Sequence, residues 1–241
     1  MSVHAQSRGV EASTLLGTTC PPRATGALRW SRFLPATEAE GPGRRAAVWV
    51  QGCRVHCPGC FNPQMWAPRG GTLTDADEIS ERWVAAARAA GSTGITLLGG
   101  EPFDQALLLA PVAAAFQAAG LSVMAFSGYT FEHLTRWAEG RDDIAALLAS
   151  TDLLCDGPFL RALPDTRRPW IGSTNQSIRA LTSAHADEVR RVDAEGRGDT
   201  LEVRVGADGI VHVNGWASDA ALAALFYDLG VRADRPQERV A

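Results

Sequence analysis

Short apolar runs alternate with helix-like segments through the middle of the chain. Residues 46–50 and 95–98 are mostly apolar, as expected of strands buried on both faces of a parallel sheet. Between them, the segment that opens at Asp75 and stops at Gly91 has acidic residues in its first turn and an apolar stripe, which predicts a helix. The alternation continues with a helix at about 105–119, a strand at 121–126, a helix from about 130 and a strand at 152–155. Strands alternating with helices predict parallel βαβ units, arranged as an open sheet or a barrel.

The two flanks of this middle part show a different pattern. Residues 28–34 alternate between apolar and polar, which predicts a strand with one solvated face. Residues 201–205 and 210–213 alternate in the same way around Asp208-Gly209, a dipeptide typical of a β-hairpin turn. A helix is predicted to follow at about 218–229.

Polar and glycine-containing segments follow four of the predicted strands. In parallel α/β folds such segments meet at the carboxyl edge of the sheet, where sites are built. We therefore predict a site at that edge. Its segments are a cysteine-rich loop at 52–60, Gly99–Pro102, Ser127–Thr130 and Asp156–Phe159.

The cysteine-rich loop carries the clearest chemical signal. Cys53, Cys57 and Cys60 place three thiols within eight residues, whereas a structural metal site normally has four protein ligands. Three cysteines around a four-iron cluster leave one iron with an open position, where a small molecule can bind. The alternative is a zinc site with His56, His133 or His185 as the fourth ligand. Zinc sites usually come as paired ligand clusters, and the sequence has no second cluster.

Composition and charge narrow the class of protein. The 241 residues, 46% of them hydrophobic, suffice for one α/β domain, which we place at 27–231 between tails at 1–26 and 232–241. The net charge is only −4 and no basic run could follow a phosphate backbone, so a nucleic-acid partner is not predicted. Nothing resembles a signal peptide or a membrane span, and the cysteine pattern does not fit a secreted disulfide framework. These features predict a cytoplasmic protein without a membrane partner.

The cysteine spacing resembles that of the radical S-adenosylmethionine (SAM) enzymes. A closer resemblance is to the activating proteins of anaerobic ribonucleotide reductase and their relatives among the glycyl-radical-enzyme activases. It rests on an ordered set of segments, which together span roughly residues 28–216. These are 41–66 with the cysteines, Gly99–Phe103, Ser127–Thr130, Asp156–Phe159 and Trp170–Gln176.

The resemblance implies a fold, a reaction and partners. The fold would be a partial parallel (β/α) barrel of the radical SAM type, with the C-terminal hairpin and helix appended. Cys53, Cys57 and Cys60 would hold a [4Fe-4S] cluster that cleaves SAM reductively and yields a 5′-deoxyadenosyl radical. The radical would take a hydrogen atom from a glycine of a large partner enzyme. A low-potential electron donor of the flavodoxin or ferredoxin type would supply the electron.

The resemblance also suggests which residues contact SAM. Gly99, Gly100, Glu101 and Pro102 would receive the methionine ammonium group, although the same residues suit an ordinary strand-to-helix turn. Ser127 is a candidate contact for the ribose hydroxyls, or part of a plain Ser-Gly turn.

Five further residues are weaker candidates. Gly59 stands where the superfamily often has an aromatic residue that helps to hold the adenine, and Phe61 is the candidate for part of that stacking role. Asp156, Asn175 and Gln176 either contact SAM or substrate, or cap helices and satisfy backbone groups.

Two other functions remain compatible with the sequence. One is a radical SAM enzyme that modifies a small molecule or peptide in a biosynthetic pathway. The other is a non-catalytic iron–sulfur or zinc protein, which would not cleave SAM.

Overall fold

The computed structural model describes residues 19–196, 200–205, 209, 211–215, 217, 219–228 and 230. Most of the two predicted tails, at 1–18 and 232–241, lies outside the described residues, as does most of the predicted hairpin turn at 206–208. Within the described part, no helix is both long and apolar enough to cross a bilayer.

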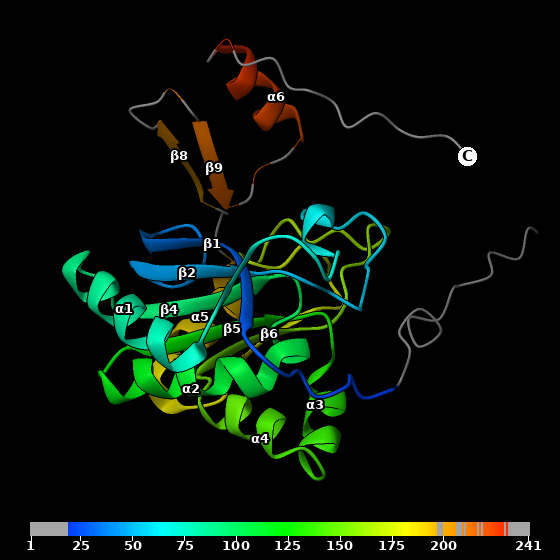
Figure 1. The fold of residues 1–241 in the computed structure, drawn as a ribbon. Coiled ribbons are helices and arrows are strands. Elements are labelled where there is room, and N and C mark those ends of the chain that lie inside the picture. Colours follow the sequence, from blue (N-terminus) through cyan, green and yellow to red (C-terminus); the bar gives the residue numbers. More distant parts are fainter. Residues whose placement is uncertain are drawn as a thin grey trace, which may run out of the picture.

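A seven-stranded mixed sheet forms the centre of the molecule (Figure 1). Its order is β3-β1-β2-β4-β5-β6-β7. Strands β2, β4, β5 and β6 pair in parallel, which confirms the predicted parallel core, whereas β1, β3 and β7 add antiparallel pairs at the two edges. The strands are β1 (Leu28–Thr37), β2 (Arg45–Val50), β3 (Thr72–Thr74), β4 (Gly94–Gly99), β5 (Ser122–Ser127), β6 (Leu153–Asp156) and β7 (Ser177–Ala180).

The sheet is open in the described part of the chain. Its edge strands β3 and β7 each have only one neighbour, so no closed barrel is present there. The expected partial barrel of the radical SAM type is therefore supported only as far as a mixed α/β fold with a mostly parallel central sheet.

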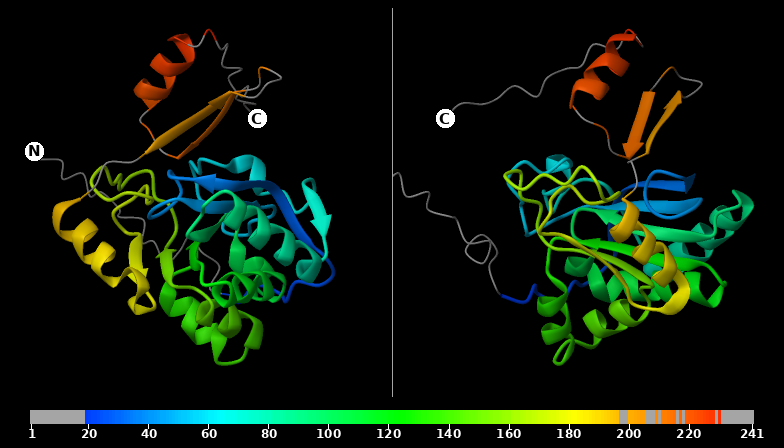
Figure 2. Two further views of the ribbon diagram at one scale, coloured as in Figure 1. Left: turned by 90° about the vertical axis from the view of Figure 1, so that its left-hand side faces the viewer. Right: turned by 180° about the vertical axis from the view of Figure 1, so that it is seen from behind.

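Helices cover both faces of this sheet. One face carries α1 (Ala76–Ala89), α2 (Ala106–Ala118), α3 (Phe131–Ala138) and α4 (Asp142–Ala149), and α5 (Ala186–Glu195) packs on the other (Figures 1 and 2). Short 3-10 turns occur at Pro63–Met65, Pro102–Gln105 and Ser183–His185. The predicted helix after Asp75 is confirmed, and the Asp75 carboxylate caps it by accepting hydrogen bonds from two backbone N–H groups of its first turn.

The sequence pattern missed four helices and strands. Strands β3 and β7 and helix α4 are only three, four and eight residues long, too short for a clear periodic signal. Helix α5 buries a single residue, Val192, so its sequence shows almost no apolar stripe.

Strand β1 differs from its prediction because both faces are at least partly covered by neighbouring elements. None of its residues is exposed. On one face, Trp83 of α1 stacks on Phe33 and contacts Trp30 edge-on. Near the end of the strand, Ala36 and Thr37 bond to the C-terminal hairpin. Neighbouring elements thus cover the face that the alternating sequence pattern predicted to be exposed to solvent.

The predicted hairpin and helix are present at the C-terminal end. Strands β8 (Leu201–Val205) and β9 (Val211–Gly215) pair antiparallel as a separate two-stranded sheet, and α6 (Asp219–Asp228) follows. In Figure 2 this unit stands above the end of the main sheet that carries β1 and β2.

Candidate functional site

A cavity of about 560 Å³ lies at the carboxyl edge of the parallel strands. Cys53, Cys57 and Cys60 line it, as do residues from each of the other three predicted strand-end segments. The prediction that these segments meet at one edge is therefore borne out in space. Those further residues are Gly99, Gly100, Glu101, Ser127, Gly128, Gly157 and Phe159.

Backbone hydrogen bonds hold the cysteine loop in shape. The N–H groups of Gly52 and Cys53 donate to the carbonyl oxygens of Met65 and Trp66, at 2.8 and 3.2 Å. The Cys60 N–H donates to the Cys57 carbonyl oxygen at 3.0 Å. These bonds close residues 52–66 into one compact loop directly after β2 and bring its thiols to a common cavity.

The surroundings of two of the three thiols favour a bound cation. Burial raises the pKa of Cys53 to about 12 and that of Cys57 to about 11, and the nearby Glu101 carboxylate adds to both shifts. A bound cation offsets this desolvation, because it stabilises thiolates. No three His, Cys, Asp or Glu side chains within the described residues are grouped closely enough to hold a metal ion as they stand.

The histidines proposed as a fourth zinc ligand are elsewhere. His56 stacks on Trp66, His133 stacks on Trp137, and neither lines the cavity. Likewise, His185 does not line it. Of the thiol and imidazole groups in the described part of the chain, those of Cys53, Cys57 and Cys60 line the cavity and no others do, which fits a cluster with one non-protein ligand better than a closed zinc site of cysteine and histidine ligands.

The segment after β4 is packed tightly on the cysteine loop. The N–H groups of Gly100 and Glu101 donate to the carbonyl oxygens of Val50 and Gly52, at 2.8 and 2.9 Å. A Cβ atom at Gly99 would lie 2.7 Å from the Trp49 Cα, and one at Gly100 would lie 2.2 Å from the Gly52 oxygen. The two glycines thus permit the close approach of one backbone to another.

Comparison with known proteins supports an iron–sulfur site. A family model described as a 4Fe-4S single cluster domain matches residues 39–179, which include the cysteine loop and all the strand-end segments. The chain belongs to this family. Similar curated proteins are named anaerobic ribonucleoside-triphosphate reductase-activating protein. Those of Vibrio cholerae and Escherichia coli K12 are each 29% identical, over 64% of this chain and 99% of their own length. That of phage T4 is 29% identical over 63% of this chain and 93% of its own.

In this 4Fe-4S single cluster domain, Glu101 is a buried hydrogen-bond acceptor at the end of β4. Its carboxylate accepts hydrogen bonds from the N–H groups of Phe103 and Gly128, at 3.0 and 2.8 Å, and from the Ser127 hydroxyl at 2.9 Å. Burial raises its pKa, the neighbouring Asp104 adds to the rise, and the three donors oppose it. Glu101 therefore joins the ends of β4 and β5.

Replacing Glu101 with glutamine is expected to lower the free energy of unfolding by about 1–3 kcal/mol. The new amide group would turn an N–H toward the N–H of Gly128 or of Phe103, so one buried donor would lose its acceptor. Urea unfolding of the purified protein measures the change. Glu139→Gln, at an exposed position after α3, is the matched control and should change stability by less than about 0.5 kcal/mol. Equal stability of the two variants would contradict the assigned role.

The other predicted contacts fall into two groups. Phe61, Ser127 and Gln176 line the cavity, as predicted for residues that contact a ligand. Gly59, Pro102, Asp156 and Asn175 do not line it. Their roles as SAM contacts stay predictions.

The positions of these residues have local explanations. Gly59 is exposed and has a φ of +81°, as needed for the tight turn between Cys57 and Cys60. Pro102 is buried at the start of a 3-10 turn. The Asp156 carboxylate accepts from the Arg179 guanidinium at 2.7 Å and from the Phe131 N–H at 2.8 Å. The Asn175 amide donates to the Pro158 carbonyl oxygen at 2.7 Å.

Sequence reasoning missed part of the cavity lining. Trp49 lies on β2 with its side chain on the cavity face, which the continuous apolar run does not reveal. Arg32 lies opposite it on β1, with its guanidinium 4.9 Å from the centre of the Trp49 ring. A further group of missed residues comes from the C-terminal unit, whose alternating pattern predicted a hairpin but not its place beside the cysteines. They are Leu201, Val213, Asn214, Gly215, Ala217 and Phe226.

Proposed function

We propose that this protein is a radical SAM activase that generates a glycyl radical in a partner enzyme of the anaerobic ribonucleotide reductase type. The observation that carries the proposal is the cavity itself. It joins three cysteines of one loop to the glycine-rich end of β4, and no further thiol or histidine from the described part of the chain lines it. The relatives' shared name supplies the kind of partner.

We assign a separate binding role to each part of the site. Cys53, Cys57 and Cys60 would hold the [4Fe-4S] cluster, which supplies the electron for reductive cleavage of SAM. Gly99–Pro102 would receive the methionine ammonium group, since the first three residues of this segment line the cavity beside the cysteines. Ser127 would contact the ribose, and Phe61, which lies 5.1 Å from Phe159 between ring centres, would pack on the adenine.

The protein would contribute position and shielding to the reaction. Half-buried and buried apolar side chains form much of the cavity wall and reduce access of water to the reacting groups. Examples are Trp49, Leu98, Phe126 and Ile171. A flavodoxin- or ferredoxin-type protein would deliver the electron, and the hydrogen atom would come from a glycine of the partner.

Anaerobic reconstitution tests the proposed function. The full-length protein is loaded with iron and sulfide, and SAM and dithionite are added. We expect 5′-deoxyadenosine and methionine to form in equal amounts. An intact four-iron cluster without 5′-deoxyadenosine would refute both radical SAM functions and leave a non-catalytic iron–sulfur protein.

Addition of a purified anaerobic ribonucleoside-triphosphate reductase tests the partner. A glycyl radical detected by electron paramagnetic resonance is the expected result. Cleavage of SAM without any glycyl radical on this enzyme would instead favour a small-molecule or peptide substrate.

A further inference from the structure

The C-terminal hairpin forms one wall of the cysteine cavity. Residues from Leu201 onward lie outside the part of the chain that the family model matches. Nevertheless Leu201 of β8, Val213 and Asn214 of β9, and Phe226 of α6 line the same cavity as the three cysteines. A substrate that binds in this cavity would therefore contact the hairpin.

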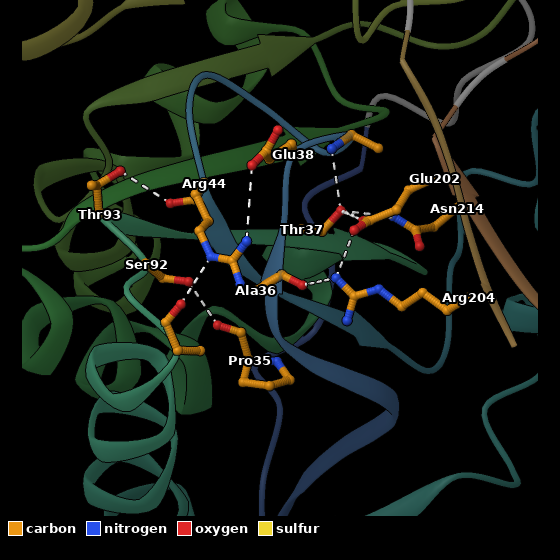
Figure 3. Close-up of polar contacts among 12 residues, drawn as sticks. Pro35, Ala36, Thr37, Glu38, Arg44, Ser92, Thr93, Glu202, Arg204 and Asn214 are labelled. Atoms are coloured by element: carbon orange, nitrogen blue, oxygen red, sulfur yellow. Dashed lines mark hydrogen bonds and ion pairs between the residues drawn. The ribbon is translucent and has the colours of Figure 1, made fainter. Parts of the chain in front are cut away.

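Specific polar contacts fix the hairpin on the end of β1 (Figure 3). The Asn214 amide donates to the Thr37 hydroxyl at 2.8 Å, and that hydroxyl donates to the Glu202 carboxylate. Arg204 donates to the Ala36 carbonyl oxygen. Thr37 and Asn214 are 1% and 6% exposed, so these bonds are shielded from water. This network sets the position of β9 relative to Arg32 of β1.

Two polar atoms beside this network have no hydrogen-bond partner among the described residues. They are Nη2 of Arg32 and Oδ1 of Asn214, both buried. The orientation of the Asn214 amide follows from chemistry, because its Nδ2 faces Glu202 Oε2 at 3.3 Å and a carboxylate only accepts. An unpaired buried donor or acceptor destabilises the folded protein, and a bound ligand that pairs with it would remove this penalty.

The charges around these two atoms favour a neutral ligand. The Glu40 carboxylate lies near enough to Arg32 to favour the positive charge of the guanidinium. The same carboxylate accepts a hydrogen bond from the Gly215 N–H at 2.8 Å. Arg204 pairs with Glu202 at 2.7 Å. Each guanidinium thus has a carboxylate nearby, so neither an anion nor a cation finds an unbalanced opposite charge.

We propose that Arg32 and Asn214 form a recognition site for the main chain of a polypeptide substrate. A peptide backbone has the matching groups: its carbonyl oxygen accepts from Arg32 Nη2, and its N–H donates to Asn214 Oδ1. The apolar wall formed by Trp49, Val213 and Phe226 packs against the peptide around these bonds. This assignment rests on the proposed function. In it, the C-terminal unit binds the substrate segment that contains the target glycine.

Binding of capped peptides to the reconstituted full-length protein tests the site. The probes are acetyl-triglycine-amide and acetyl-trisarcosine-amide. The sarcosine probe keeps the carbonyl groups but lacks most backbone N–H groups. Saturation-transfer NMR with titration gives the dissociation constants. We expect the wild-type protein to bind the triglycine probe more tightly than the sarcosine probe, because its backbone N–H groups can donate to Asn214, whereas the sarcosine probe keeps only the N–H groups of its terminal amide.

Substitutions at Arg32 provide the second arm. Arg32→Met keeps the apolar stem over Trp49 and removes the donor, and it should weaken triglycine binding about tenfold or more. Arg32→Lys keeps a donor and should give an intermediate affinity. Arg29→Met, on the same strand but outside the lining of this cavity, is the matched control and should bind as the wild type does.

Three results would overturn the site. These are no binding of the triglycine probe by the wild type, equal losses in Arg32→Met and Arg29→Met, or tighter binding of acetate than of the peptide. SAM cleavage is assayed in the same preparations without peptide. If the peptide binds in an Arg32-dependent way but the protein does not cleave SAM, the peptide site is supported and the proposed function is refuted. If the protein cleaves SAM but does not bind the peptide, SAM cleavage is supported and the peptide site is refuted.

Discussion

Replacement of Cys57 with alanine is expected to abolish both cluster binding and SAM cleavage. Only two of the three thiols that line the cavity would remain, and no other cysteine or histidine among the described residues lines it. Loss of a residue that merely supports a metal ligand costs about 10- to 100-fold in affinity or activity, and loss of a ligand should cost more. Iron and sulfide analysis, the visible absorption of the reconstituted protein and the yield of 5′-deoxyadenosine measure the effect.

Cys155→Ala is the matched control for this experiment. Cys155 is buried on β6 and does not line the cavity. Its replacement should cost about 1 kcal/mol of stability and leave the iron content unchanged. If Cys57→Ala retained full iron content and cleavage, the assignment of the cluster ligands would be wrong.

Replacement of Gly100 with alanine should have the second largest effect. The new Cβ would lie 2.2 Å from the Gly52 oxygen and 2.9 Å from the Gly52 carbonyl carbon, well inside contact distance. Both atoms belong to the backbone, so no side-chain rotation relieves the overlap. We expect a loss of about 2–3 kcal/mol in the free energy of unfolding, and a displaced cysteine loop that binds less iron.

Gly140→Ala separates this steric effect from the general effect of replacing a glycine. A Cβ atom at Gly140 would meet no atom of the described residues within 4 Å, and this glycine lies in the exposed turn between α3 and α4. Its replacement should leave stability unchanged or raise it by up to about 1 kcal/mol. Urea unfolding and iron analysis of both variants give the comparison, and equal stabilities would show that the loop adapts to a Cβ at Gly100.

Sequence reasoning succeeded where one short segment contains the whole signal. The apolar run at 46–50 predicted β2, because a strand buried on both faces needs apolar residues at every position. The loop at 52–60 predicted three cysteines at one site, because they are too close in the chain to lie apart. Helix α5 was missed because tertiary contacts, not an apolar stripe, hold it in place.

Glu101 shows how a residue can be predicted while its contacts are not. The segment 99–102 was expected at the site, and its first three residues line the cavity. The Glu101 carboxylate is nevertheless occupied by donors from its own turn and from the end of β5, at Ser127 and Gly128. Local sequence does not reveal such partners, because they come from the next strand of the sheet.

The sequence by itself determined that three cysteines share one loop and that strands alternate with helices through the middle of the chain. These depend on residue type, spacing and periodicity, which are local properties of the chain. Only the tertiary structure decided what encloses that loop. Arg32 and Asn214 are far apart in the sequence, and they share one cavity because the hairpin bonds to the end of β1. Pairing between such distant segments follows from shape and hydrogen-bond satisfaction in the folded state, which no pattern within either segment contains.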